Sequence, residues 1–253
     1  MLLETIGLTR RFGGVTAVDR VDLAIDEGRA LGLIGPNGAG KTTLVNLISG
    51  VIHADDGAIR LSGADVTRLP AHRLAALGIA RTFQGVRVFK GLTVVDNVLI
   101  GRHTRMRVDV LARLVPRPRS ASDPDRDRAL ALIERVGLGR RRAEALAGEL
   151  PYGDQRRLEI ARALASEPRL LILDEPAAGM NPTESAGLRG LIGNLLAEGL
   201  TILLIEHDVR LVMDTCQRVA VLNFGRKIAD GTPTEIQRDP VVREAYLGTE
   251  AVA

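Results

Sequence analysis

Hydrophobic and polar residues alternate with a period of two near the start of the chain, over Leu2–Leu8 and Ala17–Ile25. The turn Phe12–Gly14 lies between these stretches, so the pattern predicts an antiparallel pair of strands. Several later runs are apolar throughout, as expected of strands buried on both faces of a parallel sheet. Strands are predicted over residues 30–34, 79–84, 170–174 and 201–205, an antiparallel pair over 218–223 and 225–229, and a hairpin-like segment over 57–63.

Apolar residues spaced three and four positions apart predict helices between these strands. One of them carries clear boundary signals, with Pro70 in its first turn and Gly78 at its end. The predicted helices cover residues 44–50, 70–78, 127–136, 150–164, 184–198 and 234–247. In a chain of 253 residues these elements indicate one large α/β domain, or a core with a smaller inserted lobe.

The composition changes most clearly over residues 102–128, which hold eight arginines and four aspartates. Pro116, Pro118 and Pro124 are expected to break any long helix there. The segment is therefore predicted to be a solvated loop within a helical lobe. A sharper alternative is a basic face that meets a partner or anionic lipid headgroups.

Charge and cysteine content exclude some classes of protein. The formal charge is only +3, and aromatic residues make up 2% of the chain, so a nucleic-acid partner is not expected. The lone Cys216 excludes an internal disulfide framework and fits a reducing cytosol. We expect no signal peptide and no membrane span, because no apolar run approaches 18 uninterrupted residues.

The strongest chemical signal is a Gly-x4-Gly-Lys-Thr pattern between the apolar run Ala30–Ile34 and the helix after it. Glycines let the loop backbone point successive N–H groups at phosphate oxygens, and the new helix adds its positive end. The lysine would reach the β- and γ-phosphates, and the first threonine would bind Mg²⁺. The loop consists of Gly35, Pro36, Asn37, Gly38, Ala39, Gly40, Lys41, Thr42 and Thr43.

Polar residues at strand ends are further candidates. Asp174 and Glu175 end one predicted strand, so Asp174 suits a Mg²⁺ site and Glu175 is placed to polarise an attacking water. His207 follows another strand, and Gln84 ends a third, where it could be a metal or water ligand. Phe12 could offer its ring face to an adenine, although an ordinary core aromatic is the plainer alternative.

With these residues in this order, the chain resembles the ATPases of ATP-binding cassette (ABC) transporters over residues 3–248. The resemblance implies an α/β P-loop core with a mostly parallel sheet, an antiparallel β subdomain and an inserted α-helical subdomain. It implies one ABC ATPase domain over residues 1–253, with the core and β subdomain over 1–84 and 166–253 and the helical subdomain over 85–165.

The resemblance also implies roles. Phe12 would stack on adenine, and Gln84 would lie near Mg²⁺ and the transport domain. Glu175 would be the catalytic base, and His207 would contact the γ-phosphate. Residues 178–181, ending in Asn181, would cross a dimer interface, and Asp174 would be the Walker B aspartate.

The family signature Leu-Ser-Gly-Gly-Gln is altered in this chain. Its place is taken by Leu150, Pro151, Tyr152, Gly153 and Asp154, so the serine hydroxyl expected at a γ-phosphate is missing. The helix N-terminus can still supply N–H donors. The altered signature, the motif Arg81–Gln84 and the tail from Gly231 resemble the ATPases of branched-chain amino acid importers.

This resemblance implies a peripheral ATPase on the cytoplasmic face of a membrane, which uses ATP and Mg²⁺ to drive import of leucine, isoleucine and valine. The implied partners are transmembrane permease subunits, a second ATPase (identical or homologous) and, indirectly, an extracytoplasmic substrate-binding protein. Three alternatives stay open: another cargo such as urea, an amide or lipopolysaccharide; a non-transport cassette protein; and a P-loop small-molecule kinase.

Overall fold

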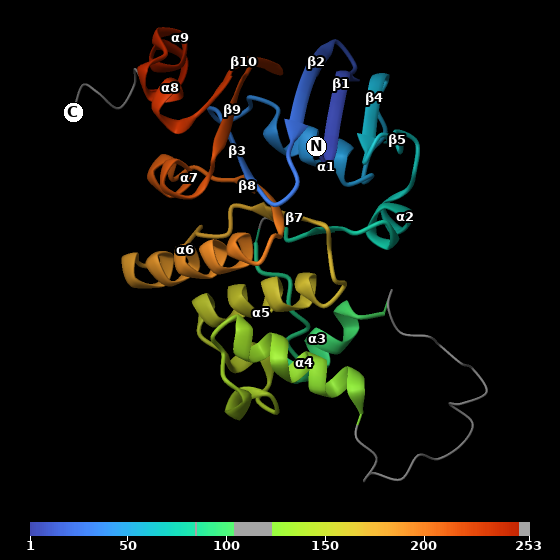
Figure 1. The fold of residues 1–253 in the computed structure, drawn as a ribbon, viewed down its shortest axis with the longest axis vertical. Helices are drawn as coiled ribbons and strands as arrows, with labels where there is room; N and C mark the ends of the chain where they lie inside the picture. Colours follow the sequence, from blue (N-terminus) through green and yellow to red (C-terminus); the bar gives the residue numbers. More distant parts are fainter. Residues whose placement is uncertain (84, 104–122, 248–253) are drawn as a thin grey trace. The chain divides into compact units, whose positions relative to one another are not determined.

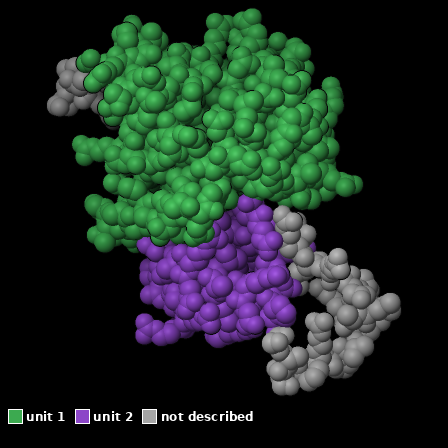
Figure 2. Space-filling view, in the orientation of Figure 1, with its two compact units in different colours: residues 1–84, 169–253 green, residues 85–168 purple. Residues whose placement is uncertain are grey.

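The computed structural model describes residues 1–83, 85–103 and 123–247 (Figure 1). Gln84 and most of the arginine-rich segment therefore lie outside the described residues. The chain divides into two compact units, residues 1–84 with 169–253, and residues 85–168 (Figure 2). Which functional subdomain each unit corresponds to stays a prediction.

A six-stranded sheet forms the centre of the first unit, in the order β10-β9-β3-β8-β7-β6. Five of its strands run parallel, and only the edge strand β10 pairs antiparallel to its neighbour. The strands β3, β7 and β8 are buried along their whole length, which explains their predominantly apolar sequences. The strands are β3 (Ala30–Ile34), β6 (Ile79–Arg81), β7 (Leu170–Asp174), β8 (Thr201–Ile205), β9 (Arg218–Asn223) and β10 (Arg226–Gly231).

A second sheet of four antiparallel strands belongs to the same unit, in the order β2-β1-β4-β5. Here the strands alternate between buried and exposed positions, as the period of two predicts. The predicted hairpin at the start of the chain is confirmed, and the hairpin-like segment forms β4 and β5. The strands are β1 (Leu3–Phe12), β2 (Val15–Ile25), β4 (Asp56–Leu61) and β5 (Ala64–Asp65).

The helices predicted over residues 44–50, 70–78 and 184–198 of the first unit lie close to helices of the structure, whereas the helix over Val209–Thr215 was not predicted. The single helix expected over residues 234–247 is wrong: Pro240, which lacks an N–H group, interrupts it. Asp239 ends one short helix and caps the next, because its side chain accepts hydrogen bonds from Val241 N and Val242 N. The helical segments are α1 (Lys41–Ile48), α2 (Ala71–Ala76), α6 (Pro182–Ala197), α7 (Val209–Thr215), α8 (Pro233–Arg238), α9 (Pro240–Val242) and the π-helical turn η3 (Arg243–Leu247).

The described part of the second unit is built from helices. Pro124 was predicted to break a helix, but it begins one. A proline is tolerated in the first turn of a helix, and Asp123 supplies the cap. Gly101 lies so close to the neighbouring helix that a Cβ atom there would be 2.1 Å from Arg162 O. The elements are α3 (Val94–Gly101), α4 (Pro124–Arg135), the 3₁₀ turns η1 (Arg140–Arg142) and η2 (Ala147–Glu149), and α5 (Tyr152–Leu164).

None of the helices in the described ranges is long and apolar enough to cross a membrane.

Candidate nucleotide site

The glycine-rich loop joins the buried end of β3 to the first residue of α1. Gly40 has φ +100°, a conformation that L-residues with a side chain rarely adopt. A Cβ atom on Gly40 would lie 2.3 Å from Ala17 O, and one on Gly35 would lie 2.2 Å from Leu222 O. The loop is therefore packed so closely against β2 and β9 that both positions require glycine. This fixes the N-terminus of α1, with its free N–H groups, at the sheet edge.

Lys41 is the first residue of α1 and is only 6% exposed. Its ammonium Nζ donates hydrogen bonds to Gly35 O at 2.6 Å and Pro36 O at 3.1 Å. Burial lowers the pKa of the Lys41 ammonium, and the negative charges of Glu175 and Asp174 oppose this shift. A buried cation at the N-terminus of a helix is suited to bind an anionic group.

A cleft of about 250 Å³ lies over this loop. Loop residues form much of its lining, and Ala17, Glu175 and His207 complete it. Glu175 and His207 are far apart in sequence, but they follow the neighbouring parallel strands β7 and β8. The structure thus brings Glu175 and His207 to one cleft with Lys41 and the other loop residues predicted to bind the nucleotide.

Glu175 and His207 contact each other directly. His207 Nε2 lies 2.8 Å from Glu175 Oε1, within hydrogen-bonding distance. The Glu175 backbone has φ +49°, an unusual value for a residue other than glycine, and such conformations occur often at functional sites. Its N–H group donates to Ile205 O at 2.8 Å, which ties this strained residue to the end of β8.

Asp174 is buried and paired with Arg81, a residue that the sequence analysis did not assign to the site. Arg81 Nη2 lies 2.7 Å from Asp174 Oδ2. The same guanidinium also donates through Nη1 to Asn46 Oδ1 on α1 at 2.6 Å and to Ser49 Oγ, in the residue that caps the end of α1, at 3.1 Å. Arg81 therefore connects the end of β6 with α1 and with the carboxylate predicted to serve Mg²⁺. Nothing in the local sequence around Arg81 indicated these contacts.

The described residues include no cluster of three or more His, Cys, Asp or Glu side chains that could hold a metal ion. A site for Mg²⁺ needs no such cluster, because Mg²⁺ is often held by one or two carboxylates together with substrate phosphates. The Thr42 hydroxyl at the start of α1 and the Asp174 carboxylate are chemically suited to it.

Phe12 ends β1 and is 47% exposed, so the alternative that it is an ordinary core aromatic is wrong. The Arg10 guanidinium lies 4.8 Å from the centroid of its ring.

Asn181 caps α6: its Oδ1 accepts from Glu184 N, and Glu184 Oε2 accepts from Asn181 N, which forms a capping box.

The altered signature lies in the second unit, at the start of α5. Pro151 occupies the N-cap position and offers no side-chain cap. Asp154 pairs with Arg142, and Tyr152 lies beside the Arg156 guanidinium, 5.7 Å from the ring centroid. Leu150 and Gly153 are buried. The predicted nucleotide contacts of these residues stay predictions.

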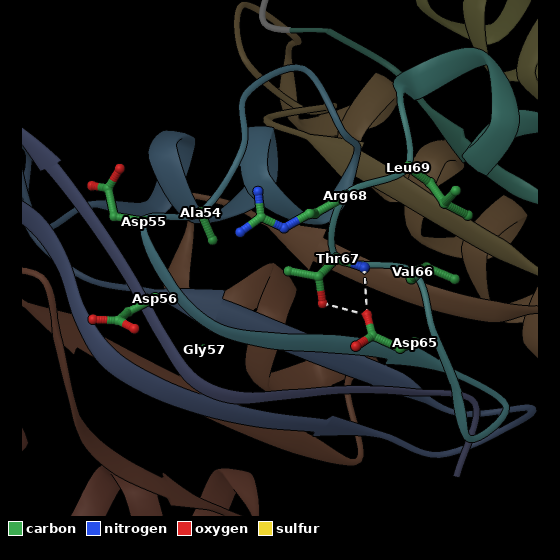
Figure 3. A pocket seen from close by; sticks show the side chains of 9 residues that line it. All are labelled: Ala54, Asp55, Asp56, Gly57, Asp65, Val66, Thr67, Arg68 and Leu69. Carbon is green, nitrogen blue, oxygen red and sulfur yellow. Dashed lines mark hydrogen bonds between the residues drawn. The ribbon is translucent and has the colours of Figure 1, made fainter.

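A larger cavity of about 450 Å³ lies beside β4 and β5 (Figure 3). Two of its three acidic residues have side-chain partners: Asp65 Oδ1 accepts from Thr67 Oγ1 at 2.6 Å (Figure 3). Asp55 Oδ1 accepts from Arg10 Nη1 at 2.8 Å. We assign no ligand to this cavity.

The sheet order and the glycine-rich loop between β3 and α1 define a P-loop nucleoside triphosphatase. The model of the ABC transporter family matches residues 18–178, and the chain belongs to this family of nucleotide-binding ATPases. A second family model, described as branched-chain amino acid ATP-binding cassette transporter, matches residues 226–252. The predicted fold class, family and ATPase activity are confirmed.

Several named ABC transporter proteins are similar to the chain over nearly its whole length. The chain is 46% identical over 250 residues to the high-affinity branched-chain amino acid transport ATP-binding protein BraF of Pseudomonas aeruginosa, with 98% of both chains covered. It is 44% identical to LivG of Escherichia coli, with the same coverage. The lipopolysaccharide export ATP-binding protein LptB of Haemophilus influenzae is 34% identical, also with 98% of both chains covered.

Solved structures agree with this placement. The crystal structure of the ADP conformation of an ATP-binding cassette of an ABC transporter superposes with a TM-score of 0.85 at 31% identity, covering 98% of both chains. A nucleotide-free ATP-binding cassette gives the same TM-score and identity, covering 97% of this chain and 98% of the other.

Proposed function

We propose that this chain is the ATP-hydrolysing subunit of an importer for branched-chain amino acids. The observation that carries the hydrolytic role is the contact between Glu175 and His207 in the cleft over the phosphate-binding loop. The cargo is supported by the relatives, because BraF and LivG are named as branched-chain amino acid transport proteins and share 44–46% identity with the chain. The 34% identity to the lipopolysaccharide export protein is lower.

In this proposal the loop backbone and Lys41 bind the triphosphate, and Phe12 supports the adenine. The Glu175 carboxylate accepts a proton from the attacking water as that water approaches the γ-phosphorus. His207 holds the Glu175 carboxylate in place through their 2.8 Å contact and contacts the γ-phosphate. Positioning and charge neutralisation provide most of the rate, as is usual for phosphoryl transfer.

The Thr42 hydroxyl, the Asp174 carboxylate and Gln84 would hold Mg²⁺, which neutralises charge on the phosphate oxygens when bound. The buried pair with Arg81 keeps one Asp174 oxygen occupied, so the other oxygen is the one offered to the metal or to its water.

The proposed assembly contains two ATPase subunits, either identical or homologous, joined to permease subunits on the cytoplasmic face of the membrane. A substrate-binding protein outside the membrane would deliver the cargo. In such a pair, residues 150–154 of one subunit would complete the nucleotide site of the other, and Asn181 would lie at the interface. ATP bound between the subunits favours the closed state, and hydrolysis removes the γ-phosphate contacts that stabilise it.

Glu175→Gln tests the hydrolytic role. The amide keeps the size of the side chain but cannot accept the proton, so kcat should fall by about 10²–10⁴-fold while ATP affinity stays within about twofold. Glu27→Gln is the matched control, because Glu27 is 66% exposed and outside the cleft. Turnover of Glu175→Gln at the wild-type rate would show that another group is the base.

The cargo is tested in cells whose only copy of the chain carries Glu175→Gln. Uptake of radiolabelled leucine, isoleucine and valine should be lost, while uptake of an unrelated amino acid such as lysine should continue. If leucine uptake is unchanged in cells whose purified variant has lost ATPase activity, the hydrolytic role holds and the cargo assignment is wrong.

A further inference from the structure

One buried carboxylate beside the cleft has no role in the proposal above. Glu206 follows β8 directly and is 3% exposed. A buried acid needs hydrogen-bond partners, and its burial raises the pKa of the Glu206 carboxyl. The partners are backbone N–H groups, which oppose that rise.

The two oxygens of Glu206 bond to two different loops. Oε1 accepts from Ala177 N at 2.7 Å, in the turn that follows Glu175. Oε2 accepts from His207 N at 3.1 Å, and the Asp208 N–H group also bonds to the carboxylate. One side chain therefore fastens the segment after β7 to the segment after β8.

These two segments carry the two members of the Glu175–His207 contact. Ala177 is two residues beyond Glu175, and His207 is the next residue after Glu206. The backbone of Glu175 has φ +49°, and a strained conformation persists only when its surroundings hold it. The hydrogen bonds from Glu175 N to Ile205 O and from Ala177 N to Glu206 supply that support on both sides of the strained residue.

We infer that Glu206 is a positioning residue that holds Glu175 and His207 in contact, and this inference rests on the roles proposed for that pair. Glutamate fits the task chemically. An ionised carboxylate has about four lone-pair sites and no donor, so it can accept from all three N–H groups. Glutamine would place an NH₂ group against one of them, and aspartate is one methylene too short to span both loops.

The test compares Glu206→Gln and Glu206→Asp with the control Glu235→Gln. Glu235 Oε2 also accepts a backbone N–H, that of Thr232 at 2.7 Å, but it caps α8 outside the cleft. Misplacing Glu175 and His207 should lower kcat of both Glu206 variants by roughly 10- to 100-fold and leave ATP affinity within about twofold. The control should keep its kcat.

A second measurement reads the contact itself. The chain has four histidines, so their imidazole ¹⁵N NMR signals can be assigned with single His→Asn variants. The His207 signal should move in the Glu206 variants while those of His53, His72 and His103 stay in place. In a His207→Ala background, Glu206→Gln should lower kcat further by less than about threefold, because the effects of substitutions at interacting residues are not additive.

The inference is overturned if a folded Glu206 variant keeps the wild-type His207 signal, whether or not its kcat falls. It is also overturned if the loss of kcat is undiminished in the His207→Ala background. Failure of the proposed function looks different: Glu175→Gln and His207→Ala would then themselves hydrolyse ATP at wild-type rates.

Discussion

The buried pair of Arg81 and Asp174 gives a prediction whose size follows from the structure. The side chains are 7% and 3% exposed, and their closest nitrogen and oxygen lie 2.7 Å apart. Arg81→Met removes the cation but leaves Asp174 buried. Breaking a buried pair in this way typically costs about 3–5 kcal/mol, because an uncompensated charge remains. The free energy of unfolding should fall by about that amount, measured by urea unfolding followed by circular dichroism.

Two comparisons isolate the cause. Arg81→Met combined with Asp174→Asn should recover most of the loss, because removing both partners leaves no buried charge. Arg189→Met is the matched control: Arg189 pairs with Asp214 at 2.9 Å, but the two side chains are 47% and 52% exposed. That substitution should cost no more than about 1 kcal/mol.

If Arg81→Met costs no more than Arg189→Met, Asp174 is not held by a desolvated partner. If the double variant is as unstable as Arg81→Met, the loss comes from the bonds that Arg81 makes to Asn46 on α1 and to Ser49 at its end. Either result would refute the reasoning that charge burial decides this position.

Three further predictions concern the nucleotide and the lone thiol. Lys41→Ala should weaken ATP binding by about 10- to 100-fold in isothermal titration, since hydrogen bonds to charged groups contribute about 1.5–3 kcal/mol, and an unchanged affinity would contradict the phosphate role. Phe12→Ala should cost about 1–2 kcal/mol of ATP affinity if the ring stacks on adenine, and no loss would leave its exposed ring without that role. Burial raises the pKa of the Cys216 thiol to about 12, so in the native protein at pH 8 it should react with Ellman's reagent at least about 100-fold more slowly than in urea. A fast native reaction would show that the site opens readily.

The local sequence pattern predicted an element well where the spacing of its apolar residues agreed with the residues that mark its ends. The strands over Ala30–Ile34 and Thr201–Ile205 match their predicted bounds, because each is a predominantly apolar run between polar or turn residues. The helix over residues 234–247 failed because its apolar spacing is helical, while Pro240 removes the N–H group that a continuous helix needs. Strand order was beyond the local pattern, since it depends on pairings between distant segments.

For the site, the sequence identified residues whose chemistry is visible in a short motif. The loop over Gly35–Thr43 and the pair Asp174–Glu175 belong to this kind. Arg81 was missed because its carboxylate partner is 93 residues away. Glu206 was assigned no role from the sequence, because the role inferred for it depends on an N–H group in the turn after β7.

The topology explains why these distant residues meet. In the sheet, β8 lies between β3 and β7, and all three run parallel, so their carboxyl ends meet at one edge. The phosphate-binding loop follows β3, His207 follows β8 after one residue, and Glu175 follows β7. Lys41 thus lies in a buried position that lowers its pKa, and the two carboxylates at the end of β7 act against that shift. The carboxylate that accepts the proton therefore also stabilises the ammonium that binds phosphate. Glu175→Gln removes the base and also one of the two negative charges that oppose the lowering of the Lys41 pKa.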